Sequence, residues 1–196
     1  MTGRHVIPLV LLWATAHAAA SQEMPNPNEV GIQTVTYSGG GCPQGSVGYS
    51  LSEDAKAITL IFDTYVVQNN GAAPIGTVQR AQKNCVIALN LRIPTGWSYS
   101  LFSIDLRGFA DLGRTGRGTQ QAAYQFGLGP YTNLGVQEIG GAFADNYFFQ
   151  NVLTVQTLNW SPCDAAERTL RLSTSLTTQS QAPEQAVSQQ KPSEQV

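Results

Sequence analysis

The chain has 196 residues, of which 42% are hydrophobic and 12% are charged, and its formal net charge at pH 7 is −2. That length suits one domain that buries its own core. The slight negative charge disfavours nucleic acid and anionic membrane surfaces as partners, because both repel a negatively charged protein.

The first 20 residues have the three parts of a secretory signal peptide. Arg4 precedes an apolar run from Val6 to Ala16, and small residues follow the run. A membrane-spanning helix needs about 20 apolar residues, so an N-terminal anchor is the less favoured alternative. We expect residues 1–20 to be removed, near Ala19 or Ser21, and the mature protein to be secreted without a membrane contact.

The mature chain expected from this cleavage contains no histidine, because His5 and His17 both precede the cut. Without Arg4 it has ten basic residues against 13 acidic ones, a net charge of −3. The lack of imidazole excludes Ser-His-Asp and Cys-His catalysis and histidine-ligated zinc, copper or iron. The acidic residues also lack the regular spacing of a calcium-binding loop. We therefore expect no metal and no cofactor.

The middle of the chain alternates apolar and polar residues with the period of β-strands. These alternating runs lie, in chain order, at 47–51, 58–62, 65–67, 85–93, 102–106, 122–126, 153–155 and 170–176. Clusters of Gly, Pro and Asn separate the runs, as turns require. The pattern predicts an all-β fold, a single antiparallel β-sandwich of jelly-roll type, with a closed barrel as the alternative.

Two polar segments flank this region. Residues 21–29 are polar and contain prolines, and residues 179–196 contain no aromatic side chain. Such segments cannot bury enough apolar surface to offset the entropy of ordering them. Both are predicted to be disordered, which places the β domain at residues 30–178.

Three cysteines in an oxidising compartment allow one disulfide and leave one thiol, with three pairings open. Cys42 and Cys163 each lie beside a proline in a loop-like setting, whereas Cys85 begins an alternating run that continues with Ile87 and Leu89. This difference favours a Cys42–Cys163 disulfide with Cys85 as a buried thiol. A nucleophilic role for Cys85 is disfavoured because no histidine can activate it.

Four short runs appear together in this order: GGCPQGSV at Gly40–Val47, KNC at Lys83–Cys85, the stretch Ile104–Tyr124, and WSPC at Trp160–Cys163. Their order and spacing resemble the family catalogued as domain of unknown function 4360, small secreted proteins found largely in fungi and bacteria. The resemblance covers roughly residues 30–176. It implies a shared secreted β fold and carries no known catalytic residues with it.

Carboxylates are the residues that could drive hydrolysis in a protein without histidine, and a glycosidase needs two of them flanking the scissile bond. Asp105 and Arg107 share one face of a predicted strand, where they bind a sugar or form an ordinary surface ion pair. Sequence alone does not bring two carboxylates together. The candidates in the middle of the domain are Asp63, Asp105, Asp111, Glu138 and Asp145.

Exposed aromatic rings bind the apolar faces of sugars. Trp97 and Tyr99 share one strand face after a turn, and Tyr131 follows Gly129-Pro130, so these three rings are candidate ligand contacts, although a core role is open for each. Trp160 is expected to cover the disulfide. At least one ring of the consecutive residues 147–149 must point outward if they form a strand.

Two further motifs carry weaker signals. The glycine-rich stretch 113–118 contains two arginines and could bind an anion, but a solvated loop explains it equally well. Asn159-Trp160-Ser161 is an N-glycosylation sequon, and Asn159 must face outward if it carries a glycan.

These observations favour a secreted, non-catalytic module that binds polysaccharide or another extracellular protein, or that serves a structural role in the cell wall. The site expected for this binding comprises Trp97, Tyr99, Tyr131, Asp105 and Arg107. The alternative is a carbohydrate-active enzyme, a hydrolase or lyase that uses carboxylates alone. The alternative requires two acidic side chains that converge in a cleft.

Overall fold

The computed structural model describes residues 25–69, 77–154, 158–163, 167–181 and 186–189. A short 3-10 helix, η1 (Pro27–Glu29), precedes a chain of strands that all pair in antiparallel fashion. The strands are β1 (Gly31–Ser38), β2 (Val47–Leu51), β3 (Ile58–Phe62), β4 (Val66–Gln68), β5 (Val78–Arg92), β6 (Ser103–Leu112), β7 (Arg117–Phe126), β8 (Thr132–Ile139), β9 (Phe143–Val152), β10 (Glu167–Gln181) and β11 (Ala186–Gln189).

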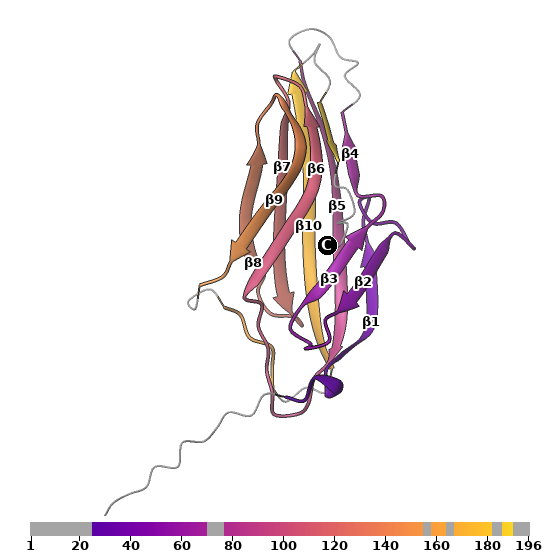
Figure 1. Ribbon diagram of the computed structural model, residues 1–196, viewed down its shortest axis with the longest axis vertical. Coiled ribbons are helices and arrows are strands. Elements are labelled where there is room, and N and C mark those ends of the chain that lie inside the picture. The colour runs from indigo at the N-terminus through magenta and orange to yellow at the C-terminus, as the bar shows by residue number, and fades with distance from the viewer. Residues whose placement is uncertain (1–24, 70–76, 155–157, 164–166, 182–185, 190–196) are drawn as a thin grey trace, which may run out of the picture.

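The strands form two facing layers. One layer is a five-stranded sheet in the order β1-β5-β10-β7-β8, and the other contains a four-stranded sheet in the order β4-β11-β6-β9 and the separate pair β2-β3. Figure 1 shows β6 and β9 in front of β7. The predicted antiparallel β-sandwich is therefore confirmed. Neither sheet closes on itself, so the barrel alternative is wrong.

The longest ladder of the molecule joins β5 to β10. Fifteen residue pairs run without a register shift from Arg92↔Glu167 to Val78↔Gln181. At about 3.3 Å per residue, the ladder is about 50 Å long. Since β1 pairs with the other side of β5 and β7 with the other side of β10, this ladder is the centre of the larger sheet.

The core lies on the inner face of this ladder. Successive side chains of a strand point to opposite faces, so the alternating apolar residues of β5 all face the second layer. Tyr124 and Leu170 join them from the neighbouring strands, and each buried ring or branched side chain stabilises the fold by roughly 1.5–3 kcal/mol. The fully or nearly fully buried residues of β5 are Cys85, Ile87, Leu89 and Leu91, and Ile93 just after the strand is also buried.

The C-terminal segment contains more strand than its composition predicts. β10 continues to Gln181, and β11 over 186–189 pairs with both β4 and β6. The expectation of disorder from residue 179 is wrong for these residues, because main-chain pairing needs no apolar side chains of its own. The predicted signal peptide lies outside the described residues.

The disulfide joins Cys42 to Cys85, and Cys163 is an exposed free thiol. The expected Cys42–Cys163 pairing is wrong for a geometric reason. After β1, the main-chain N–H of Gly41 donates to the carbonyl of Asn84 at 2.9 Å, which brings Cys42 beside Cys85 with Cα atoms 5.5 Å apart.

Cys163 lies beyond the C-terminal end of β5. Its carbonyl accepts a hydrogen bond from the N–H of Gly96 at 3.2 Å, beyond Arg92 where β5 ends. The seven residues from Cys85 to Arg92 span about 23 Å. A disulfide needs Cα atoms within about 7 Å of one another, so Cys163 cannot reach either partner.

The disulfide leads to a stability prediction. Replacing both Cys42 and Cys85 by serine opens a loop with a sequence separation of 43 and should lower the free energy of unfolding by about 4 kcal/mol. Urea denaturation followed by fluorescence measures the change. The matched control is Cys163→Ser, which removes an exposed thiol and should leave the midpoint unchanged; an equal loss in both variants would contradict the assigned pairing.

Candidate functional site

Two of the predicted ligand contacts, Trp97 and Tyr99, belong to the core. Both are half-buried and pack against the main apolar cluster. The ring of Tyr99 meets Phe126 edge to face with centroids 4.8 Å apart. Burial raises the pKa of the Tyr99 hydroxyl, which has no hydrogen-bond partner among the described residues. These two rings serve packing and present little surface to a ligand.

The third predicted contact, Tyr131, is exposed and lies on a loop beside the loop of Trp160. The side-chain amide of Asn159 donates to the carbonyl of Pro130 at 3.4 Å, which joins the two loops. Tyr131 is 48% exposed and Trp160 is 55% exposed. The expectation that Trp160 covers the disulfide is wrong, because the disulfide lies farther along β5. We call Tyr131 and Trp160, with the fully exposed Leu128 nearby in sequence, the aromatic end.

Hydrogen bonds hold the loop of Trp160 against the core. The N–H of Asn159 donates to the hydroxyl of Tyr124 at 3.3 Å, and its carbonyl accepts from the hydroxyl of Ser100 at 2.7 Å. Ser161 and Tyr99 exchange two bonds, one from the N–H of Ser161 to the carbonyl of Tyr99 and one from the N–H of Tyr99 to Oγ of Ser161. The exposed indole therefore stands on a main chain that is fixed on both sides.

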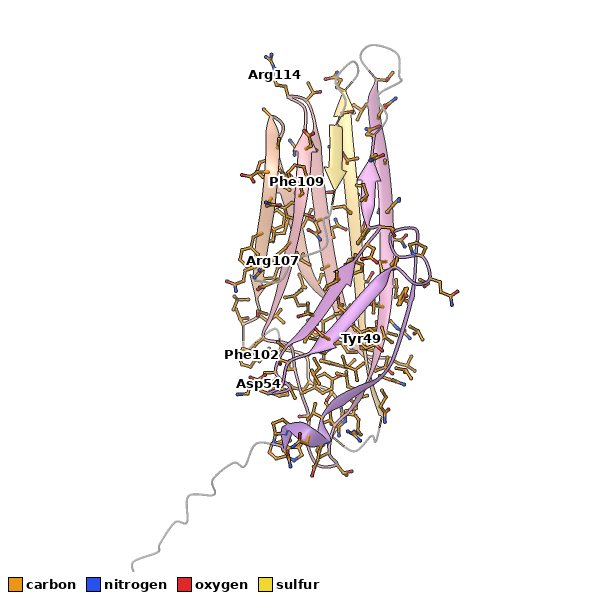
Figure 2. The ribbon with its side chains drawn as sticks, turned by 45° about the vertical axis from the view of Figure 1, so that its right-hand side comes forward. Tyr49, Asp54, Phe102, Arg107, Phe109 and Arg114 are labelled. Carbon is orange, nitrogen blue, oxygen red and sulfur yellow. A yellow bond between two sulfur atoms is a disulfide. The ribbon has the colours of Figure 1, made fainter. Side chains whose placement is uncertain are left out.

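Asp105 and Arg107 share the outer face of β6, as the two-residue period predicts. An Arg107 nitrogen lies 3.8 Å from an Asp105 oxygen, and the guanidinium stacks over Phe148 of β9, 4.7 Å from its centroid. Figure 2 shows Arg107 and Phe109 on this strand and Phe102 just before it. The ion pair is exposed and contributes little to stability. Tyr131 adjoins β8 in the other layer, so these residues are not part of the aromatic end.

The consecutive aromatic residues 147–149 divide between the two faces of β9. Tyr147 is buried and Phe148 is 51% exposed, so one ring points outward as expected. A shallow open groove of about 390 Å³ runs between β8 and β9. Its lining residues are Glu138, Ile139, Gly140, Phe143, Asn146, Tyr147, Phe148 and Phe149.

The candidate carboxylates do not form a general acid–base pair. Asp63, Asp111 and Asp145 are exposed, and Asp105 and Glu138 each face an arginine, the latter at 2.8 Å from Arg117. A general acid is usually kept protonated by burial, which none of these five has. Among the described residues no cluster of three or more His, Cys, Asp or Glu side chains could hold a metal.

The described residues also contain no helix long and apolar enough to cross a membrane.

The chain belongs to the family described as Domain of unknown function (DUF4360), whose profile matches residues 28–196. It is 38% identical over 141 residues to an uncharacterized secreted protein of Arthroderma benhamiae, a match that covers 72% of this chain and 56% of that protein. The chain thus spans little more than half the length of this relative. The predicted family resemblance is confirmed.

Two solved structures show a distant likeness. One is TmCBM61 in complex with β-1,4-galactotriose, with 8% identity, coverage of 84% of this chain and 90% of that one, and a TM-score of 0.27. The other comes from work on CBM4 structure and function, with 16% identity, coverage of 67% and 87%, and a TM-score of 0.19. At these TM-scores neither likeness bears on what this chain binds.

The buried hydroxyls lead to a paired prediction. Tyr99→Phe removes a buried hydroxyl that has no described partner and should leave stability unchanged or raise it by up to about 1 kcal/mol. Tyr65→Phe should instead cost about 1–2 kcal/mol, because the Tyr65 hydroxyl accepts from Thr174 at 3.0 Å and donates to the Lys83 carbonyl at 3.3 Å. Urea denaturation at pH 7 compares the variants; a larger loss for Tyr99→Phe would contradict this assignment.

The sequon leads to a second prediction for this region. The side chain of Asn159 is half-buried and bonded to Pro130, and Ser161 of the same sequon is buried, so an attached glycan would break the bond that joins the two loops. We expect Asn159 to be unmodified in protein secreted from a eukaryotic host. Intact mass before and after peptide N-glycosidase treatment measures this, and a fall in mass after treatment would contradict it.

Proposed function

We propose that this protein is a secreted, non-catalytic module that binds extracellular polysaccharide through Tyr131 and Trp160. The observation that carries the proposal is the pair of exposed rings on two loops that Asn159 joins. Flat aromatic rings offer apolar surface and a polar edge, which suits the faces and hydroxyl groups of a pyranose. Loops that are already fixed lose little entropy when a ligand binds.

Four observations support the secreted and non-catalytic parts of the proposal. The first 20 residues have the pattern of a signal peptide, and the Cys42–Cys85 disulfide suits an oxidising compartment. The related protein of Arthroderma benhamiae is a secreted protein. Chemistry by carboxylates alone would need a buried acid, and the five candidates are exposed.

The proposed contacts differ in part from the set that the sequence favours. Of the five expected residues, Tyr131 stays in the proposed site, Tyr99 supports it from the core, and Trp97 packs against the core. Asp105 and Arg107 lie on the outer face of β6 and are not proposed as contacts at the aromatic end. Trp160 takes the place of Trp97 as the indole available to a ligand.

The proposal is tested by incubating the secreted protein with insoluble chitin, β-glucan, cellulose and pectin and measuring its depletion from solution. Tyr131→Ala and Trp160→Ala should each weaken binding by about two- to twelvefold, since one aromatic contact contributes about 0.5–1.5 kcal/mol. Tyr49→Ala is the matched control, because Tyr49 is 50% exposed on β2 and lies outside the site. Binding that survives the double variant would contradict the assigned site.

The same incubations separate binding from catalysis. Depletion without release of soluble sugar fits the proposed module. Sugar release that is lost in one Asp→Asn or Glu→Gln variant of the five candidate carboxylates would show the enzyme alternative instead. A protein that neither leaves solution nor releases sugar would favour a protein partner or a structural role.

A further inference from the structure

The strands at the ends of the two main sheets differ in how their outer edges are protected. An unpaired edge attracts another strand unless it is short, bulged or charged. β4 has three residues, β1 has a register shift between Ile32 and Thr34, and β8 pairs with β7 across a shift between Gln121 and Ala123. β9 pairs with β6 over ten residues without a shift, and within the described part of the chain no strand pairs with its other side.

The residues of β9 favour strand pairing. The strand reads FADNYFFQNV, which contains no proline and no lysine, is rich in aromatic residues and carries one charge, Asp145, near its start. Phe148 is 51% exposed and Val152 is 68% exposed, so apolar surface lies along the outer face of the strand. The groove between β8 and β9, with Phe143 and Phe149 among its lining residues, continues this apolar surface around the edge. In Figure 1, β9 bounds the front sheet on its left side.

We propose that β9 pairs in antiparallel fashion with β9 of a second copy of this chain, around a two-fold axis at Phe148. A two-fold axis makes the interface self-complementary, as in most symmetric dimers. The main-chain N–H and C=O groups of one edge then satisfy those of the other. The four-stranded sheets of the two copies become one continuous sheet of eight strands.

The side chains favour a register with the axis at Phe148 over a register with the axis at Tyr147. With the axis at Phe148, the two Phe148 rings face each other, Asn146 of one copy faces Gln150 of the other, and Ala144 faces Val152. Aromatic cross-strand pairs and matched polar pairs stabilise sheets. Moving the axis to Tyr147 would place Phe148 opposite Asn146, which loses the pair of rings. Arg107, already stacked on Phe148, borders the paired rings on each side.

The dimer would change how polysaccharide is bound, a consequence that rests on the proposed function. Because the axis reverses the direction of one copy, the two aromatic ends lie at opposite ends of the dimer. Two sites that face away from each other can bind two polysaccharide chains at once, and such a dimer would cross-link them.

Analytical ultracentrifugation of the secreted protein tests the dimer, with Cys163→Ser as the background so that the exposed thiol cannot join chains. We expect a dimer for this background and a monomer for Phe148→Lys, which places a charge on the pairing edge. Asn146→Lys is the second edge variant, with the same expected result. Phe102→Lys is the control, because Phe102 is 66% exposed but precedes β6, and it should remain dimeric.

A cross-link tests the register. Phe148→Cys in the Cys163→Ser background should form a disulfide-linked dimer on a non-reducing gel, whereas Tyr49→Cys in the same background should not. A monomeric background protein, or a dimer that persists in both lysine variants, would overturn the proposal. Glycan depletion measured on the Phe148→Lys monomer keeps the two proposals separate, because single-site binding at Tyr131 and Trp160 does not depend on β9.

Discussion

The unbroken pairing of β5 with β10 is the constraint on which the rest of the structure depends. Fifteen consecutive pairs hold the two longest strands in one register, and a slip by one residue would turn every core side chain of β5 to the outer face. β1 and β7 pair with the outer sides of these strands, so the register of the β5–β10 pairing also sets the registers of β1 and β7. The disulfide of Cys85 lies partway along this ladder, and the loop of Cys163 lies beyond its end at Arg92. The ladder therefore sets the positions of both.

The aromatic end shows how a packed core positions a surface. Tyr99 and Tyr124 place their rings inside and bind the loop that carries Trp160: the main-chain N–H of Tyr99 donates to Ser161, and the hydroxyl of Tyr124 accepts from the N–H of Asn159. A residue that the sequence pattern marks as a ligand contact can therefore act as the support for its neighbour. This division of roles is typical of sites on β-sandwiches, where loops present contacts and the sheets hold the loops in place.

Local periodicity accounts for what could be predicted and what could not. The alternation in β5, β7 and β10 predicted both the strands and the buried faces, and the shared face of Asp105 and Arg107 followed from the same period of two. β8 was not predicted, because its polar and glycine residues interrupt the alternation. β11 lies in a segment where composition indicates disorder; its pairing with β4 and β6 comes from main-chain groups that sequence patterns do not report.

The sequence by itself determined the all-β class, the family, the absence of histidine after residue 20 and the faces of the regular strands, because these depend on composition and on neighbours along the chain. Only the tertiary structure decided that Cys42 meets Cys85, that Trp97 packs half-buried against the core while Trp160 is exposed, and that β9 ends its sheet. Each of these depends on which distant segments lie side by side. Alternation gives the side to which a residue points, but not what lies opposite it.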